Sequence, residues 1–129
     1  MPVSRLESEL RSGRFVVATE VTPTISANAD KLIRDIELVK PYVTAINFTD
    51  SSSARPRMSS AACSNVAYNQ GVEPVRQLAA RDTTRCRRRA DIAGGTVLGI
   101  ENVVGVSGDR SEVGDSPAGG WHSGAVHQA

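Results

Sequence analysis

Four short runs rich in β-branched residues recur along the chain at intervals of about 30 residues, the length of one strand-helix-return unit. They span residues 15–18, 43–48, 72–75 and 102–106, and each leads into a polar residue. This recurrence favours parallel strands joined by helices, as in a partial (β/α)8 barrel of about four units. Because parallel strands end at one rim, the sequence predicts that the polar residues after the runs face one pocket.

The first of these polar residues is Glu20, directly after the run Phe-Val-Val-Ala. A carboxyl group at the end of a buried strand lies beside apolar side chains. Burial there is expected to raise its pKa from about 4.3 toward neutrality, because it disfavours the charged form. Such a group suits general acid catalysis. The alternative is an ordinary rim carboxylate in an ion pair with Arg55 or Arg57, and position alone favours neither.

The other three strand ends supply Thr49, Gln77 and the pair Gly108-Asp109. Thr49 and Gln77 carry donors and acceptors that suit a planar heterocycle, although either side chain equally suits loop backbone. Gly108 allows backbone amides to approach a ligand closely, whereas a simple Gly-Asp turn is the alternative. The sequence contains no GxGxxG motif, P-loop or nucleophile elbow. It therefore does not match the commonest classes of nucleotide-binding protein or acyl-transfer enzyme.

Composition indicates one soluble domain, with 129 residues, 40% hydrophobic and 22% charged, and a formal net charge of +1. This balance favours neither nucleic acid nor a membrane as a partner. No apolar run approaches the roughly 20 residues that span a bilayer, and residues 1–11 lack a signal-peptide core, so the cytoplasm is the expected compartment. Cys63 and Cys86 belong to no metal-binding motif and are expected to stay reduced.

Helices are predicted between the runs from capping residues and apolar spacing. The first covers about 4–13 and is expected to close the bottom of the barrel, and the second begins near 28–30 and ends before 41. The third covers about 58–70, and the fourth follows residues 82–84. In the fourth, one apolar stripe is expected to pack inward. Its members are Cys86, Ala90, Ala93 and Val97.

Arginines at 85 and 87–89 lie mainly off that stripe. Without interleaved aromatic residues they favour a solvated helix face over a phosphate or nucleic-acid site. Residues 116–129 contain several glycines and a proline but no apolar periodicity, and they predict a flexible tail. In that tail Trp121 has no evident core to join, and the spacing of His122 and His127 predicts no metal site.

The motifs at the strand ends resemble the methylenetetrahydrofolate reductase family in order and spacing. They are Phe-Val-Val-Ala-Thr-Glu-Val-Thr-Pro at 15–23, Ala-Ile-Asn-Phe-Thr-Asp at 45–50, Glu-Pro-Val-Arg-Gln-Leu-Ala-Ala-Arg-Asp at 73–82, and Val-Ser-Gly-Asp at 106–109. The resemblance covers about residues 4–117. It implies a (β/α)8 barrel that binds FAD, takes hydride from NADH or NADPH, and reduces 5,10-methylenetetrahydrofolate to the 5-methyl form.

The resemblance also implies roles for individual residues. Glu20 matches the acid that protonates the folate so that its five-membered ring opens to an iminium. Asp109 matches the aspartate between flavin and pterin, whose charge tunes the flavin and binds the amino-pyrimidine edge of the substrate. The positions that match flavin-lining residues are Thr49, Gln77, Ser107 and Gly108. After Gln77 the chain has Leu-Ala-Ala where many members have Leu-Thr-Cys, which removes a hydroxyl and a thiol.

The chain supplies four of the eight units of such a barrel, which takes about 250 residues. Residues 1–115 are therefore expected to form the N-terminal half of a reductase-like barrel, followed by the tail at 116–129, as in a truncated or frame-shifted product. Two alternatives stay open. One is an inactive half-barrel that acts by pairing with itself or with a partner supplying the missing strands. The other is an anion- or nucleic-acid-binding module that uses Arg85 to Arg89.

Overall fold

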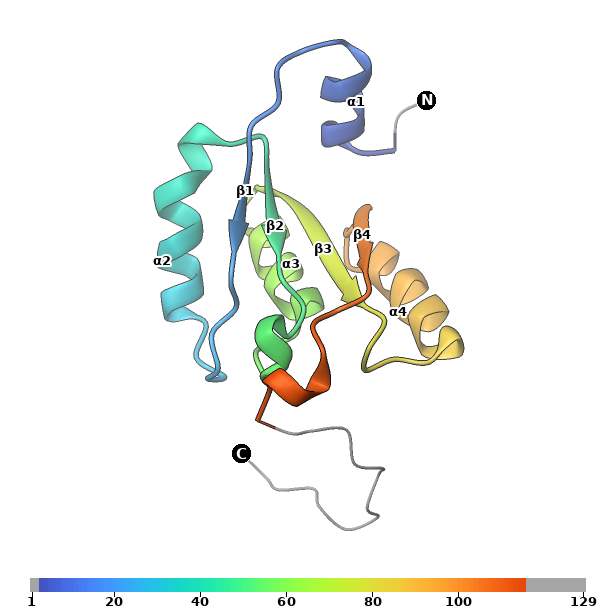
Figure 1. Ribbon diagram of the computed structural model, residues 1–129. Helices are drawn as coiled ribbons and strands as arrows, with labels where there is room; N and C mark the ends of the chain where they lie inside the picture. The colour runs from blue at the N-terminus through green and yellow to red at the C-terminus, as the bar shows by residue number, and fades with distance from the viewer. Residues whose placement is uncertain (1–2, 116–129) are drawn as a thin grey trace.

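The computed structural model describes residues 3–115, in which strands and helices alternate (Figure 1). The strands are β1 (Ala18–Val21), β2 (Ala45–Phe48), β3 (Glu73–Ala79) and β4 (Asn102–Val106). The helices are α1 (Arg5–Arg11), α2 (Asp30–Val39), α3 (Ser60–Asn69) and α4 (Arg85–Val97). Short 3-10 turns complete the elements: η1 (Lys40–Tyr42), η2 (Ser52–Ala54) and η3 (Ser111–Val113).

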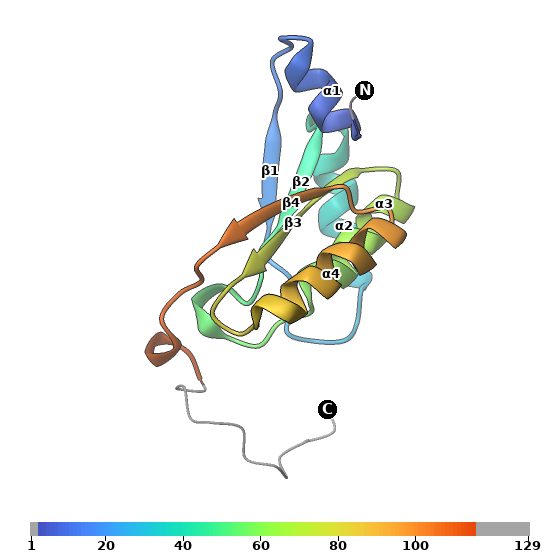
Figure 2. The ribbon, with the colours of Figure 1, turned by 90° about the vertical axis from the view of Figure 1, so that its right-hand side faces the viewer.

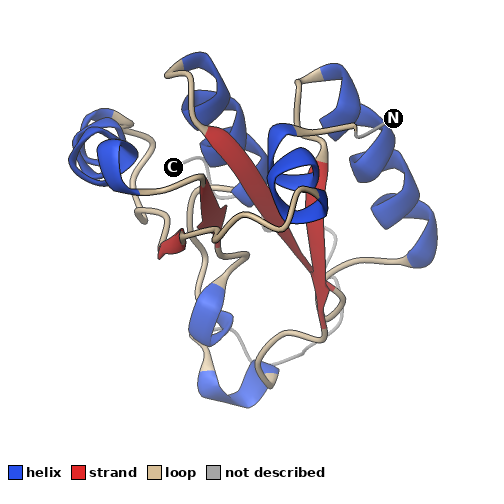
Figure 3. Cartoon of the chain, turned by 90° about the horizontal axis from the view of Figure 1, so that it is seen from above, coloured by secondary structure: helices blue, strands red, loops and turns tan. Residues whose placement is uncertain are grey.

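The strands form one parallel sheet in the order β1-β2-β3-β4. Each crossover therefore adds the next strand on the same side, which is the winding of a barrel and differs from that of a doubly wound sheet. The predicted fold class, a partial α/β barrel of four βα units, is confirmed. Seen from above, the strands cross one another at an angle, as in a twisted sheet (Figure 3). Within the described residues, β1 and β4 are edge strands.

The hydrophobic core lies between the sheet and the helices α2 and α3, which cover the same face together with α4 (Figure 2). Side chains alternate between the two faces of a strand, so every second residue of β2 points into this core. The fully buried members are Leu32, Ile36, Ile46, Phe48, Cys63 and Ala67. The opposite face of the sheet carries polar side chains and is the inner face of the expected barrel.

Helix α1 lies beyond the end of the sheet at which the strands begin (Figure 1). Ser4 caps it by accepting a hydrogen bond from Glu7 N at 3.1 Å. The same Ser4 hydroxyl contacts Asn102 Oδ1 at 2.7 Å, and Asn102 Nδ2 donates to Glu73 Oε1 at 2.8 Å. These contacts fix α1 to the first residues of β3 and β4, so the helix closes the bottom of the half-barrel as predicted.

The first strand differs from the prediction. It begins at Ala18, not at Phe15, and Glu20 consequently lies within the strand. Phe15 is 93% exposed. The register explains the difference, because β2 pairs with β1 only from Ala18 onward, which leaves no sheet beside the Phe15 ring. The third strand also runs further than predicted, through Gln77 to Ala79.

The packing face predicted for α4 is wrong. The four stripe residues Cys86, Ala90, Ala93 and Val97 are all exposed. Arg76 of β3 points toward α4 and is only 7% exposed, and its Nη1 donates to Asp91 O at 2.9 Å. A buried guanidinium requires acceptors, so α4 turns Asp91 and the buried Gly95 toward the sheet in place of the stripe.

The expectations for Trp121, His122 and His127 concern residues outside those described. Among residues 3–115, no helix has the length and apolar character to cross a membrane, and no cluster of histidine, cysteine and acidic residues suits a metal ion. Cys63 in α3 is buried and Cys86 in α4 is exposed, and both thiols are free.

The two cysteines are expected to differ strongly in reactivity. Burial raises the pKa of Cys63 from 9.0 to about 11, so the folded state keeps this thiol neutral. Its contribution to stability is full below pH 9.0 and is lost as the pH rises through about 11. With iodoacetamide at pH 8, mass spectrometry should show Cys86 modified first and Cys63 modified only in urea. Similar rates for the two thiols in the folded chain would contradict the packing of α3.

Candidate active site

Three polar side chains from neighbouring strands meet on the inner face of the sheet. Glu20 of β1 pairs in register with Asn47 of β2, and Gln77 lies two residues beyond Val75, the partner of Asn47 in β3. Asn47 Nδ2 donates to Glu20 Oε2 at 3.1 Å, and Gln77 Nε2 donates to the same oxygen at 3.2 Å. The two amides hold one oxygen of the Glu20 carboxylate and leave the other oxygen without a partner among the described residues.

The surroundings of Glu20 differ from both sequence-based expectations. The side chain is exposed, because no second layer covers the inner face of the sheet within residues 3–115. It also forms no ion pair with Arg55 or Arg57: Arg55 Nε lies 3.6 Å from Asp115, and Arg57 Nη1 donates to Pro23 O at 3.0 Å. The carboxylate is therefore positioned by neutral amides and not by a cation.

Gln77 also lines a cavity of about 280 Å³ together with the residues that follow β4. Its other lining residues include Asp50, Ser52, Ser107, Gly108 and Asp109. Gly108 has a φ of +86°, and a Cβ at this position would lie 3.1 Å from Arg81 Cβ. The left-handed backbone conformation therefore favours glycine here, and a side chain would in addition make a tight contact with Arg81.

Asp109 is anchored to the loop after β2 by its side chain. Its Oδ2 accepts a hydrogen bond from Ser53 N at 2.6 Å. Asp50 joins the same region to β3, because its Oδ2 accepts from Ala79 N at 2.8 Å. Backbone-to-carboxylate bonds therefore tie the loop after β2 both to the loop after β4 and to the last residue of β3, which keeps the cavity walls in place.

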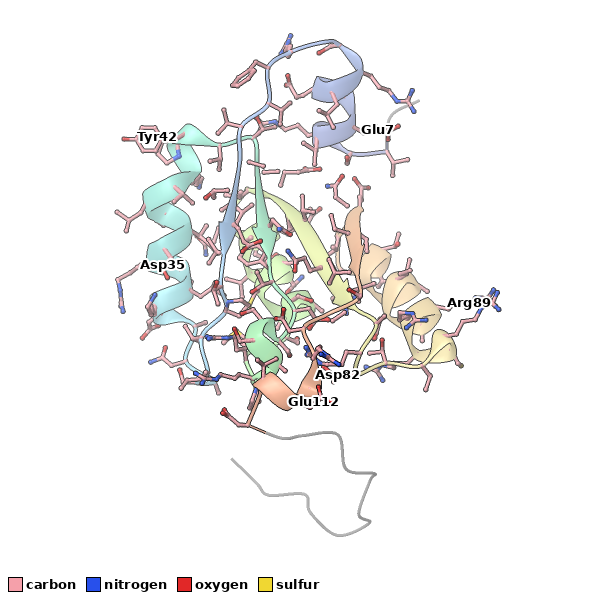
Figure 4. The ribbon with its side chains drawn as sticks, in the orientation of Figure 1. Glu7, Asp35, Tyr42, Asp82, Arg89 and Glu112 are labelled. Atoms are coloured by element: carbon pink, nitrogen blue, oxygen red, sulfur yellow. The ribbon has the colours of Figure 1, made fainter. Side chains whose placement is uncertain are left out.

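Arg81 is a site residue that the sequence analysis missed. Its guanidinium donates to Asp109 O at 3.0 Å, to Ser51 O at 3.3 Å and to Asp82 Oδ2 at 2.6 Å, so it connects the loops after β2, β3 and β4. The hydrogen bond from Arg81 lowers the pKa of Asp82, and the same bond raises the pKa of Arg81. Asp82 lies at this rim in Figure 4. In the sequence, the adjacent charged pair Arg81-Asp82 shortly after the third strand could have indicated this role.

Two buried polar atoms of the inner face lack a partner within the described residues. They are Asn47 Oδ1 and Thr49 Oγ1, and Thr49 is only 5% exposed. A buried polar atom without a hydrogen bond costs free energy, so such atoms suit a ligand that brings donors and acceptors. A flavin ring has both along its edge, and the residues at this rim therefore fit that cofactor.

The family model for methylenetetrahydrofolate reductase matches residues 5–126 of the 129-residue chain. The chain belongs to this family. The match extends past residue 117, where the resemblance was expected to end. A search of curated proteins found no match. Membership indicates an oxidoreductase with a methylenetetrahydrofolate reductase-like function, and the family is generally flavin-dependent.

Within this methylenetetrahydrofolate reductase family fold, the predicted residues share the rim at which the parallel strands end. Gln77 is central, because it contacts Glu20 and lines the cavity with Ser107, Gly108 and Asp109. Thr49 directly follows β2, and no side-chain hydrogen bond of the described residues joins it to the others. Asn47 was missed, although a polar residue inside an apolar strand signals a functional face.

The arginines of α4 lie away from this site. Arg87 Nε pairs with Asp91 at 3.1 Å, and Arg88 Nη1 donates to Thr83 O at 3.0 Å. Arg85 and Arg89 are exposed, and Arg89 points outward from α4 (Figure 4). Two of the four are engaged within the chain, so the geometry favours the solvated helix face over an anion-binding module.

Proposed function

We propose that the chain carries the flavin-facing part of a methylenetetrahydrofolate reductase active site. The reaction is FAD-mediated hydride transfer from NADH or NADPH to 5,10-methylenetetrahydrofolate, giving 5-methyltetrahydrofolate. The observation that supports this most strongly is the Glu20 carboxylate, held by Asn47 and Gln77 beside the cavity at Gly108 and Asp109. Family membership supplies the reaction class, and this geometry supplies candidate residues for it.

In this proposal the flavin is held at the rim by Thr49, Gln77, Ser107, Gly108 and Asp109. When bound, FAD would accept the hydride from the reductant and pass it to the folate. The glycine allows the backbone to approach the ligand closely, and the Thr49 hydroxyl and the Asn47 carbonyl gain partners that they lack among residues 3–115. Arg81 keeps the three loops together and acts as a positioning residue.

In this proposal Glu20 is the general acid: it donates the proton that opens the five-membered ring of the folate to an electrophilic iminium. Asn47 and Gln77 donate to Oε2, which orients the carboxyl group and leaves Oε1 free to carry that proton. The exposed inner face gives a substrate direct access to this oxygen. A positioned general acid of this kind contributes about 10²- to 10⁴-fold to the rate.

The proposal also requires further strands that complete the pocket, because the described sheet has only four. The inner face within residues 3–115 is open, and the edges of β1 and β4 have no partner strand there. A second copy of the chain, or a partner that adds strands at these edges, would cover the face and complete the barrel. Assembly thus belongs to the proposed activity and is not an alternative to it.

Changing Asp109 to Asn is expected to slow folate turnover by about tenfold or more while the flavin stays bound, because a charge near the reacting groups is lost. The Asn side chain keeps an oxygen that accepts from Ser53 N, so the loop geometry survives. Flavin absorbance of the purified variant and stopped-flow reoxidation by the folate measure the two effects. Asp35→Asn on α2 is the control (Figure 4). An unchanged reoxidation rate would count against the role of Asp109.

A further inference from the structure

Strand β3 continues beyond the point at which its neighbour β2 ends. The register of β2 with β3 stops at Phe48 and Arg76, whereas β3 stays paired with β4 as far as Ala79. Backbone groups of successive residues in a strand point to opposite sides. Because Ala80 N donates to the backbone of β4, the backbone groups of Gln77 and Ala79 face the other side, where β2 has already ended. These groups therefore need hydrogen-bond partners from outside the sheet.

Two side chains act as those partners. Ser60, the first residue of α3, donates from its hydroxyl to Gln77 O at 2.7 Å. Asp50 Oδ2 accepts from Ala79 N at 2.8 Å. Ser60 is only 1% exposed, so water cannot readily replace it as the donor to Gln77 O. The two side chains thus continue the role of β2 along the end of β3 that carries the proposed site.

The orientation of the Ser60 hydroxyl is fixed by Arg76. Arg76 Nε donates to Ser60 Oγ at 3.4 Å, and Arg76 Nη1 donates to Asp91 O of α4 at 2.9 Å. The Arg76 side chain is 8% exposed, and that of Asp91 is 18% exposed. Since a guanidinium has donors only, the single proton of the hydroxyl cannot point toward Arg76 and is left for Gln77 O. Ser60 consequently has a filled acceptor side and one committed donor bond.

Gln77 transmits this restraint to the proposed acid. Its carbonyl is bound by Ser60, and its side-chain Nε2 donates to Glu20 Oε2 at 3.2 Å. Fixing the backbone of a residue fixes the direction of its Cα–Cβ bond, and with it the place from which the side-chain amide reaches the carboxylate. A continuous series of contacts therefore leads from α4 to the inner face of the sheet, through Asp91, Arg76, Ser60, Gln77 and Glu20.

We propose that Ser60 is a positioning residue for the Glu20 carboxyl group and that it acts through Gln77. The inference rests on the proposed function, in which Glu20 protonates the folate. Ser60 is buried between α3 and β3 and bonds to the backbone of β3, so its effect on the reaction is indirect. A displacement of about 1 Å at reacting groups can slow a reaction by about 10²-fold. Removing the hydroxyl is therefore expected to lower the rate of the proton-dependent step and to leave the affinity for the folate unchanged.

NMR spectroscopy of the full chain without ligands tests the structural part of this proposal. Gln77 is one of three glutamines, so the side-chain amide signals that disappear in Gln77→Ala identify it. Ser60→Ala should shift those signals, because loss of the donor releases the Gln77 carbonyl and with it the amide bond to Glu20. Ser59→Ala is the matched control: Ser59 caps α3 by accepting from Ala62 N at 3.2 Å, and no hydrogen bond joins its side chain to β3 within residues 3–115. It should lower the melting temperature without shifting the Gln77 signals.

Stopped-flow kinetics of the flavin-loaded chain tests the functional part. Ser60→Ala should slow reoxidation of the flavin by the folate about tenfold or more, with the rate of flavin reduction by NADH or NADPH and the half-saturating folate concentration unchanged. Ser60→Cys fills a similar volume with a weaker donor, and its rate should lie between those of the wild type and Ser60→Ala. Ser59→Ala should match the wild type in both half-reactions.

Unshifted Gln77 signals or an unchanged reoxidation rate in Ser60→Ala overturn the proposal, and so does an equal slowing of both half-reactions. Effects of the same size in Ser59→Ala overturn it as well. The NMR measurement needs no flavin and no folate, so it can fail while proton transfer from Glu20 stands. If the signals shift as expected but Glu20→Gln leaves folate reduction intact, the placement of Glu20 by Ser60 holds and only its role as the acid fails.

Discussion

Glu20→Gln is expected to abolish folate reduction while NADH or NADPH still reduces the bound flavin at its normal rate. Glutamine has nearly the same shape, and its side-chain oxygen still accepts from Asn47 and Gln77, but it has no acidic proton to give. Loss of a general acid lowers the affected step by about 10²- to 10⁴-fold. Reduction of the flavin involves no such proton on the folate and is spared.

The two half-reactions can be followed separately by flavin absorbance in a stopped-flow instrument. Glu37→Gln is the matched control, because Glu37 lies on the outer helix α2 and its one ion pair within the described part of the chain is with Lys40, at 3.8 Å. Equal loss of both half-reactions in Glu20→Gln would refute the role of Glu20. Such a result would instead indicate a structural contribution of its bonds to Asn47 and Gln77.

Phe48→Ala is expected to lower the free energy of unfolding by about 3–5 kcal/mol, the usual cost of removing a fully buried aromatic ring. Phe48 is 0% exposed in the core between β2 and the helices. Domains of this size are stable by only about 5–15 kcal/mol, so the substitution removes a large part of the total. Urea unfolding followed by circular dichroism measures the change.

The other phenylalanine of the chain is the control for this experiment. Phe15 is 93% exposed, and Phe15→Ala should change the free energy of unfolding by less than about 0.5 kcal/mol. Comparable losses for the two substitutions would show that Phe15 is packed, and would place the first strand where the sequence predicted it. The two substitutions thus test whether Phe15 lies outside the first strand.

Local signals in the sequence were sufficient for most of the elements. Ser4 caps α1 at the start of the first predicted range, Thr84 caps α4 at the end of 82–84, and Gly71 follows α3 with a φ of +75°. The fourth run, 102–106, is the strand β4 without change. Caps and left-handed turns depend on a few adjacent residues, so they are visible without knowledge of the rest of the chain.

The packing partners of those elements were not visible in the same way. The stripe that begins at Cys86 has helical spacing, yet α4 turns another side toward the sheet, because Arg76 of β3 needs Asp91 as an acceptor. Likewise, Glu20 was expected to be buried or paired with an arginine, and it is held by Asn47 and Gln77. Each of these contacts joins residues far apart in the sequence.

The sequence alone therefore determined the alternation of strands and helices, the parallel half-barrel and the rim on which the polar strand ends gather. Periodicity, capping residues and the family motifs carry that information within short stretches. Only the tertiary structure decided which face of α4 is buried, that Arg81 joins three loops, and which amides orient Glu20. Strand register and helix rotation are set by contacts between distant segments, and a linear pattern does not contain them.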